Sequence, residues 1–491
     1  MQKVIILTSG GSVAVAARLL AKAGTVSGEV KAEAFPDGEI HHQLETAVDN
    51  SEVVVCGNFD FTEPDQTMEL FDVGSLAADE GAIGLTLITP EDRRNDKHTR
   101  FFRRVQARML SAIPETPLGN RVLPVDEQTM SMPVYRKPAL RRRPNKRAAS
   151  GAAIDLFEYR GAPVLFATKS YGYMLADFLK LHDFQPGDCH REAGTGLVTG
   201  VSGVAGRDVV IVGGTIDHAE TIELYLLANA VYEAGAVSMT IVIPYFGYST
   251  MERGKPELHE AVKAAYRARL ISSIPACPLG NRVVMTDLHS EGIPHYFHGV
   301  RTTHVYAIKR IIMEALGERL GGRICTTDAG RGKWAESLVK DINRLLKGRG
   351  IAVDQFWQAA FALKDRKSGS DTELLGVLGD VAGLDIDLFD DMIRRGSTAI
   401  EAGVGYRSGI PGKEGTGCRK IRFFSSHGVL PGNALDRLRG AVDLQGEPLF
   451  DEVIVTDSHP SAVRQAGDFL KVKSISYILV EEVLRLLRPG A

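Results

Sequence analysis

Short apolar runs alternate with longer segments of helical spacing along most of the sequence. Runs that are apolar on both faces predict buried parallel strands, and they read KVIILTS, EVVVCGN, GLTLIT, PVLFATK, DVVIVGG and MTIVIPY. Segments between them, such as TIELYLLANAVYEAG, have the period of a helix, and this one ends on Gly235 as a helix C-terminus should. The pattern predicts an α/β protein whose parallel sheets are flanked by helices.

The same pattern occurs twice in the first two thirds of the chain. ARMLSAIPETPLGNRV at 107–122 matches ARLISSIPACPLGNRV at 268–283 at 11 of 16 positions, with an offset of 161. Residues 67–90 correspond to 221–244 with an offset of 154. Since 161 − 154 = 7, the second copy should contain an extra loop, which begins YFGYSTM at 245–251. A duplicated domain is the natural explanation.

A third region begins after about Thr303. Its strands RICTTDAG, IDLFDDM, KIRFFSSHG and DEVIVTDS each run into a polar, acidic or Gly-containing loop. Open α/β sheets bind ligands at such carboxyl ends of strands. We therefore expect four regions: a first, degenerate copy at 1–135, a basic linker at 136–158, a second copy at 159–305 and a C-terminal domain at 306–491.

Composition limits the classes of function. The formal charge of -3 predicts no nucleic-acid partner, and no apolar run reaches the roughly 18 residues of a membrane span. The five cysteines are scattered without a CxxC spacing, which predicts free thiols in a reducing cytoplasm rather than disulfides or a Cys-based metal site.

The segment DLFDDMIRRGSTAIEAG carries the most specific chemistry. A strand delivers Asp390 and Asp391, and a loop at 392–397 then leads to Thr398 and a helix. Backbone N–H groups of such a loop bind phosphate, while two carboxylates suit sugar hydroxyls or a bridging Mg²⁺. A phosphate at one end and a diol at the other describe ribose 5-phosphate. The alternative is that the two acids only cap the following helix.

Three weaker sites accompany it. His289 follows Asp287 at a strand end, where it either binds a metal or phosphate or is a structural histidine. Asp328 lies in a Gly-, Arg- and Lys-containing turn that suits Mg²⁺ and phosphate, unless it is a plain turn. Lys364 and Arg366 precede SGSD, and they predict either a mobile cationic loop that closes over a triphosphate or a solvated hairpin tip.

The order of these motifs resembles the phosphoribosyl-pyrophosphate (PRPP) synthase family. DLH, DAG, a KxR loop, DDM…GST, SHG and VIVTDSHP follow one another between residues 160 and 491, and FPDGE at 35–39 looks like a family segment near the N-terminus. The resemblance implies tandem phosphoribosyltransferase-like domains, a homo-oligomer, and Mg²⁺-ATP and ribose 5-phosphate as substrates. It implies transfer of the β,γ-pyrophosphoryl group of ATP to the ribose 1-hydroxyl, which needs positioning and cations rather than a nucleophilic side chain.

The resemblance also implies residue roles. His289, Lys364 and Arg366 would be catalytic, and His289 and Asp328 would hold Mg²⁺. The ATP contacts would be Phe35, Asp37, Glu39, Glu252, Arg253 and His289. The ribose 5-phosphate contacts would be Asp390, Asp391, Arg394, Arg395, Gly396, Ser397 and Thr398.

Some positions depart from the family pattern. The ATP loop PYFGYSTMERGKP is closer to the plant-type class, and Arg394 stands where the family has an acid or Gln. Two other functions therefore stay open: an inactive regulatory relative, or a phosphoribosyltransferase that consumes PRPP. The first copy lacks the extra loop and has Gln128 at the position of His289. We hypothesise that it supplies residues 35–39 to the second copy, within the chain or across an oligomer.

Overall fold

The computed structural model describes residues 4–9, 25–90, 97–125, 161–316, 321–327, 329–352, 356–368, 371–409 and 416–488. The chain divides into two compact units. Unit 1 comprises Met1–Met285, Ser290–Thr303 and Val480–Ala491. Unit 2 comprises Thr286–His289 and His304–Leu479. Unit 1 contains residues of both predicted copies, whereas 286–289 and 304–305 of the predicted second copy fall in unit 2. The predicted linker at 136–158 lies outside the described residues.

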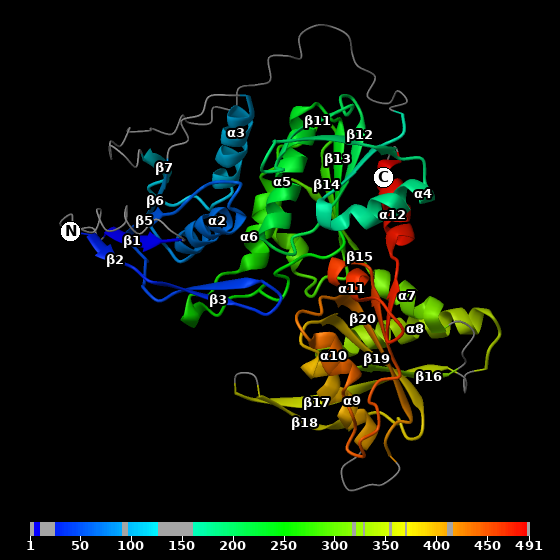
Figure 1. Cartoon of the computed structure of the whole chain (residues 1–491). Coiled ribbons are helices and arrows are strands. Elements are labelled where there is room, and N and C mark those ends of the chain that lie inside the picture. The colour runs from blue at the N-terminus through cyan, green and yellow to red at the C-terminus, as the bar shows by residue number, and fades with distance from the viewer. Residues whose placement is uncertain are drawn as a thin grey trace. The chain divides into compact units, whose positions relative to one another are not determined.

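The first half of unit 1 contains a five-stranded parallel sheet of order β2-β1-β5-β6-β7 (Figure 1). Its strands are β1 Val4–Thr8, β2 Thr25–Ser27, β5 Glu52–Cys56, β6 Gly84–Pro90 and β7 Asn120–Val125. An antiparallel hairpin is formed by β3 Val30–Ala34 and β4 Ile40–Leu44. The helices of this half that the structure describes are α2 Pro64–Asp79 and α3 Lys97–Ser111.

The second half of unit 1 has a six-stranded sheet of order β15-β14-β13-β12-β8-β9. The strands are β8 Val164–Ala167, β9 Gln185–Pro186, β12 Asp208–Val212, β13 Ser238–Ile243, β14 Asn281–Thr286 and β15 Arg301–Val305. A hairpin consists of β10 Asp188–Arg191 and β11 Val198–Ser202. The helices are η1 Lys169–Tyr171, α4 Gly172–Leu181, α5 His218–Glu233, η2 Pro256–Leu258, α6 Lys263–Ser272 and η3 Ile293–Tyr296.

The sequence repeat recurs as structure. Helices α2 and α5 both have 16 residues and begin 154 positions apart, at Pro64 and His218. Strands β7 and β14 both begin at the Asn of the repeated LGNRV segment, 161 positions apart. The strand order β2-β1-β5-β6-β7 is matched by β9-β8-β12-β13-β14. The extra loop of the second half lies between β13 and α6, where the sequence places it.

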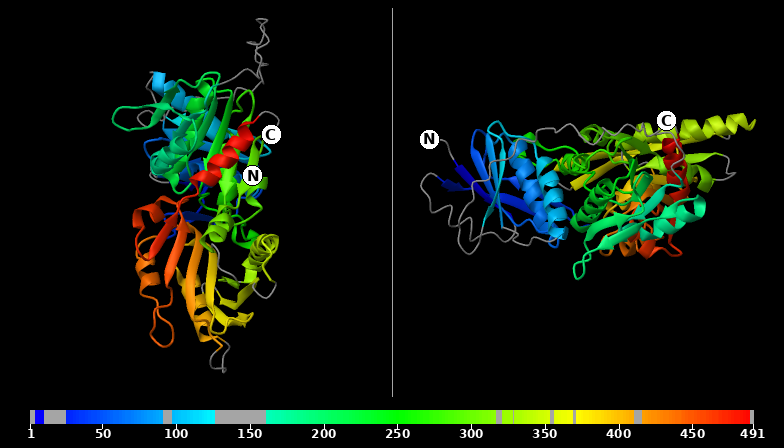
Figure 2. Two further views of the ribbon diagram at one scale, coloured as in Figure 1. Left: turned by 90° about the vertical axis from the view of Figure 1, so that its right-hand side faces the viewer. Right: turned by 90° about the horizontal axis from the view of Figure 1, so that it is seen from above.

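Unit 2 is built on a seven-stranded sheet of order β18-β17-β16-β19-β20-β21-β22. Its strands are β16 Gly322–Thr326, β17 Trp357–Ser368, β18 Asp371–Leu378, β19 Asp385–Ile393, β20 Lys420–Gly428, β21 Glu452–Thr456 and β22 Leu470–Lys473. The helices that the structure describes in this unit are α7 Ala307–Leu316, η4 Ala329–Arg331, α8 Gly332–Gly348, α9 Ser397–Ser408, α10 Ala434–Arg439 and α11 Pro460–Gln465. Figure 2 shows α8 on one face of this sheet and α9 with α10 on the other. Helix α12, Ser476–Leu487, belongs partly to each unit.

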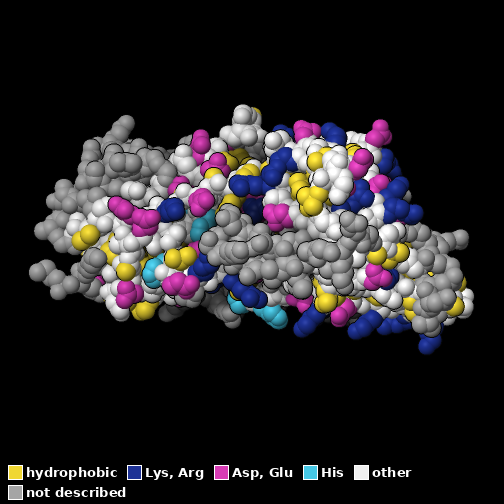
Figure 3. All heavy atoms as spheres, turned by 90° about the horizontal axis from the view of Figure 1, so that it is seen from below, with side chains coloured by type: hydrophobic (Ala, Val, Ile, Leu, Met, Phe, Trp, Pro, Cys, Tyr) yellow, Lys and Arg dark blue, Asp and Glu magenta, His cyan; other side chains and the backbone are white. Residues whose placement is uncertain are grey.

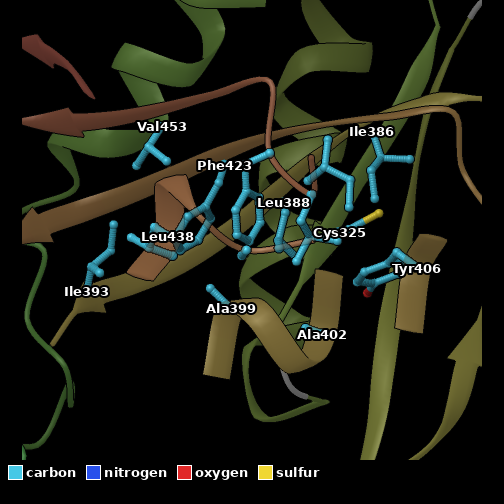
Figure 4. Packing of buried hydrophobic residues seen from close by; sticks show 14 of the residues in the cluster. Cys325, Ile386, Leu388, Ile393, Ala399, Ala402, Tyr406, Phe423, Leu438 and Val453 are labelled. Carbon is cyan, nitrogen blue, oxygen red and sulfur yellow. The ribbon is translucent and has the colours of Figure 1, made fainter. Parts of the chain in front are cut away.

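The core of unit 2 lies between the sheet and helices α9 and α10 (Figure 4). Phe423 and Leu388 are fully buried there, and the small side chains of Ala399 and Ala402 let α9 approach the strands closely. The buried Tyr406 hydroxyl donates a hydrogen bond to the Thr326 carbonyl at 2.9 Å. This packing fixes the start of α9 beside the carboxyl ends of the strands.

The charges on the surface are mixed, and the cysteines are not paired with one another. On the face in Figure 3, basic and acidic side chains are interspersed and hydrophobic side chains are scattered in small groups. All five cysteines are free thiols. Within the described ranges, no helix has both the length and the apolar character needed to cross a membrane.

The structure corrects two details of the expected elements. Strand β19 extends through Ile393, so Asp390 and Asp391 lie on the strand itself and the connecting loop is only 394–396. Continuous pairing with β20 explains the extension, because Met392 and Ile393 still have partners there. Residues 286–289 belong to unit 2 although they follow the second repeat directly.

Candidate active site

The site of unit 2 forms where four parallel strands end at one edge of the sheet. β16, β19, β20 and β21 are adjacent and parallel. Their ends deliver Thr327, the Asp390–Asp391 pair, His427 and Ser458. Thr327, His427 and Ser458 are buried, so they form the floor of the site rather than its surface. This is the edge at which the sequence predicted ligand binding.

Asp391 is the centre of the charged cluster. Its Oδ2 accepts a hydrogen bond from Nδ1–H of His289 at 2.5 Å and forms an ion pair with Nη2 of Arg331 at the same distance. The guanidinium nitrogen also lies 3.0 Å from the His289 ring nitrogen. The structure therefore joins His289 and Asp391, which the sequence predicts separately, and adds Arg331 to them.

The two neighbouring carboxyl groups titrate in opposite directions. Burial, followed by the charge of Asp391, raises the pKa of Asp390 well above its ordinary value. Burial alone would also raise the pKa of Asp391, but the hydrogen bond from His289 and the charge of Arg331 hold that pKa well below its usual range. The two carboxyl groups therefore differ in acidity, with Asp390 holding its proton more tightly than Asp391.

A second layer fixes the backbone that carries His289. Asp287 has a positive φ of 42°, and its carboxylate accepts the Ile308 N–H at 3.0 Å. The Asp287 carbonyl accepts a hydrogen bond from Nε2 of the buried His427 at 3.0 Å, and Nδ1 of His427 lies 2.7 Å from the Ser458 hydroxyl. Burial lowers the pKa of His427 to about 4, so the ring is neutral at physiological pH. These contacts orient the 287–289 segment toward Asp391.

His289 keeps one ring nitrogen available for chemistry. In the tautomer in which Nδ1–H donates to Asp391, Nε2 carries the lone pair. A ring oriented in this way by a carboxylate is the arrangement in which histidine binds a cation or accepts a proton.

The 394–396 loop leads into the N-terminus of α9. Gly396 has a φ of 77°, and a Cβ there would lie 3.0 Å from Leu438 side-chain atoms, so the position requires glycine. Arg395, Ser397 and Thr398 are exposed, and Arg394 is half-buried and engaged in an interaction. Exposed N–H groups at a helix start form an anion site. The predicted phosphate loop therefore has a suitable backbone.

The predicted metal residues are only partly described. Asp328 lies outside the described residues. Among the residues that the structure does describe, no group of three or more His, Cys, Asp or Glu side chains could hold a metal ion. Mg²⁺ commonly takes one or two protein ligands and completes its shell with water and phosphate oxygens, so His289 with Asp391 fits an ion that arrives with a nucleotide.

Lys364 and Arg366 lie on strand β17 rather than in a loop. Their backbones pair with Leu374 and Thr372 of β18 in an antiparallel hairpin. The side chains of both cations lie outside the described atoms. The two residues thus lie on one arm of a β-hairpin, two positions apart.

The remaining predicted residues belong to unit 1. Phe35 and Asp37 are half-buried in the turn of the β3–β4 hairpin, and Phe35 N–H donates to the Glu39 carbonyl at 2.7 Å. Glu39 is only 2% exposed, and its carboxylate accepts the Tyr248 N–H of the second half. Glu252 is half-buried, whereas Arg253 is exposed and 3.8 Å from the Glu252 carboxylate.

Sequence reasoning did not foresee the pairing of Arg331 with Asp391. The sequence shows only that Arg331 follows a strand end, and many such cations are solvated. The pairing follows from the strand order of the structure: β16 is adjacent to β19, so the segment after β16 approaches the acidic pair.

Parts of this chain are similar in sequence to known proteins. The family model for the N-terminal domain of ribose phosphate pyrophosphokinase matches residues 184–274. A ribose-phosphate pyrophosphokinase of Brucella melitensis is 28% identical over 287 residues, which are 57% of this chain and 82% of that protein. One of Chromobacterium violaceum is 25% identical over 286 residues, covering 58% of this chain and 78% of that protein.

A solved structure shows the same fold. The phosphoribosylpyrophosphate synthetase of Mycobacterium smegmatis superposes with a TM-score of 0.52 at 22% identity, covering 67% of this chain and 100% of that chain. The chain therefore has the α/β, phosphoribosyltransferase-like fold that its sequence predicts. The family model and the sequence relatives thus show that this chain is similar to ribose-phosphate pyrophosphokinases.

Proposed function

We propose that this protein is a ribose-phosphate diphosphokinase, which transfers the β,γ-pyrophosphoryl group of Mg²⁺-ATP to the 1-hydroxyl of ribose 5-phosphate, giving PRPP and AMP. The observation that carries the proposal is the strand-end cluster of His289, Arg331, Asp390 and Asp391 beside the glycine-started helix α9. The names of the relatives support the same activity.

Ribose 5-phosphate fits the site of unit 2 by chemistry. The exposed N–H groups at the start of α9, with Arg394, Arg395, Ser397 and Thr398 around them, would bind the 5-phosphate. Asp391 would accept a hydrogen bond from one ribose hydroxyl, and Asp390, the less acidic of the two, would hydrogen-bond to the other. The hydroxyl at C1 would then attack the β-phosphorus of ATP, with AMP as the leaving group.

Cations would neutralise the negative charge that develops during the transfer. Bound Mg²⁺ would neutralise charge on the phosphate oxygens, and His289 with Asp328 or Asp391 would be its protein contacts. Lys364 and Arg366 would stabilise the transferring group. In unit 1, Phe35, Asp37 and Glu252 would contact adenine and ribose of ATP, and Arg253 its phosphates. Glu39, the remaining residue of this set, is buried, and its carboxylate accepts the Tyr248 N–H of the loop that carries Glu252 and Arg253.

The first half of unit 1 has an accessory part in this proposal. It lacks the 245–251 loop and has Gln128 in place of His289, so it would not form a second nucleotide site. We regard it as a duplicated copy that has been retained for its Phe35–Glu39 segment and for assembly.

The test is AMP formation from Mg²⁺-ATP that depends on ribose 5-phosphate. Asp391→Asn should lower kcat by about 10²-fold or more, because it removes a charge at the reacting end of the site. Asp385→Asn is the matched control, since Asp385 is on the same strand but its exposed carboxylate pairs with Arg419. The control should retain wild-type kcat.

Other outcomes would contradict the proposal. If wild-type protein forms no AMP but binds a true synthase tightly, it is an inactive regulatory relative. If it releases pyrophosphate from PRPP in the presence of a base, it is a phosphoribosyltransferase. If Asp391→Asn and Asp385→Asn behave alike, the strand-end cluster is not the reacting site.

A further inference from the structure

The two halves of unit 1 contact each other with an internal two-fold relationship. Arg108 on α3 forms a 3.1 Å ion pair with Glu233 at the end of α5. Arg269 on α6 forms a 2.8 Å ion pair with Asp79 at the end of α2. The repeat offsets of 161 and 154 relate Arg108 to Arg269 and Asp79 to Glu233. Each half thus gives the other the same contact, as two copies of one subunit do across a two-fold axis.

One side of this interface is different from the other. Asp72 on α2 contacts both Lys263 and Arg267 of α6, and all three side chains are completely buried. The repeat places Leu226, Phe102 and Gln106 at the equivalent positions, so the charged cluster has no counterpart on the other side. The charged cluster lies next to the 245–251 loop, which the first half lacks.

The buried cations support that loop through Tyr248. The Arg267 guanidinium lies 4.5 Å from the centre of the Tyr248 ring, and the Lys263 ammonium 5.6 Å from it. Tyr248 has a φ of 61°, a left-handed conformation that costs a non-glycine residue roughly 1–3 kcal/mol and persists only when neighbouring groups hold it. The carboxylate of Glu39, from the first half, accepts the Tyr248 N–H.

The first half also contacts the far end of the same segment. Strand β4 pairs with residues 259–261 across a bridge between Gln43 and Glu260. The Leu44 N–H donates to the His259 carbonyl at 3.3 Å, and the Ala261 N–H donates to the His42 carbonyl at 3.0 Å. The segment from 248 to 261, which includes Glu252 and Arg253, is therefore held at both ends by the first half.

We infer that Glu39 is a positioning residue, which fixes the 245–253 loop of the second half by holding Tyr248 in its left-handed conformation. The nucleotide role of that loop rests on the proposed function, but the contact itself does not. Glu39 would then affect ATP use without touching ATP, because its carboxylate faces a backbone N–H and is only 2% exposed.

Hydrogen exchange of the 245–251 peptide, measured by mass spectrometry on the full chain without ligand, tests the contact directly. Glu39→Met preserves side-chain length and burial but removes the acceptor, and it should speed exchange of the Tyr248 amide at least tenfold. Glu39→Gln keeps an acceptor oxygen and should restore protection to within about threefold. Glu33→Gln, on the exposed side of the same hairpin, should have no effect.

Kinetics then tests the nucleotide role. Glu39→Met should raise the KM for ATP about tenfold and leave the KM for ribose 5-phosphate unchanged, and Glu39→Gln should recover most of the ATP affinity. If exchange in Glu39→Met equals that of wild type, the positioning role is wrong even if activity falls. If exchange rises but the ATP KM does not, the loop has no nucleotide role. If wild type forms no AMP, the proposed function fails while the exchange result still decides the role of Glu39.

Discussion

Replacing Asp72 with Asn should destabilise unit 1 more than most single substitutions do. Asp72 forms ion pairs with two cations that are both fully buried, Lys263 and Arg267. Asn has nearly the same shape as Asp but no charge. The variant therefore leaves two buried cations without their counter-ion and adds almost no change in packing.

The magnitude follows from how each cation can respond. Burial, offset in part by Asp72, lowers the pKa of Lys263 to about 8, so losing its proton at pH 7 adds only about 1.4 kcal/mol. Arg267 cannot respond in this way, because a guanidinium stays protonated in proteins. Removing one partner of a buried ion pair typically costs about 3–5 kcal/mol. We expect a loss in that range, with Arg267 responsible for most of it.

Urea unfolding followed by two signals measures this loss. Far-UV circular dichroism reports on both units, whereas Trp334 and Trp357 both belong to unit 2. The unfolding transition of unit 1 is the one seen by circular dichroism but not by tryptophan fluorescence. Its midpoint should move to a lower urea concentration. Asp79→Asn is the matched control, since its pair with Arg269 is 30% and 26% exposed and is worth about 0–1 kcal/mol. A loss no larger for Asp72→Asn than for Asp79→Asn would refute the reasoning.

Two further predictions concern pH and backbone conformation. Burial lowers the pKa of His42 from 6.5 to about 3. Between these two pH values the unfolded chain binds a proton at His42 and the folded chain does not. The free energy of unfolding therefore falls as pH drops below 6.5, by about 2 kcal/mol at pH 5. The unfolding free energy of His42→Gln should lack this part of the change between pH 7 and 5, and an unchanged pH dependence would contradict the assignment. Gly396→Ala should raise the KM for ribose 5-phosphate several-fold and destabilise unit 2 by about 1–2 kcal/mol, as measured by kinetics and thermal unfolding. Gly432→Ala is its control: Gly432 also has a positive φ but lies in open space, so an equal rise in KM would show strain alone to be responsible.

Local sequence was sufficient for the elements and for the internal repeat. The apolar run DVVIVGG became β12, because a strand buried on both faces leaves no polar position in its pattern. The repeat offsets located the extra loop between β13 and α6 without any knowledge of the fold. The DDMIRRGST segment likewise identified a strand, a glycine turn and a helix start, since each depends on neighbouring residues.

Contacts between distant segments were beyond the reach of sequence. Arg331 and Asp391 are 60 positions apart, and their ion pair exists because β16 and β19 are neighbours in the sheet. Glu39 and Tyr248 are 209 positions apart, and they meet because α2 packs against α5 and α6. The sequence by itself determined which elements form and which residue types stand at their ends. Only the tertiary structure decided which of those ends face each other, because strand order and helix packing depend on the burial of whole faces rather than on any local pattern.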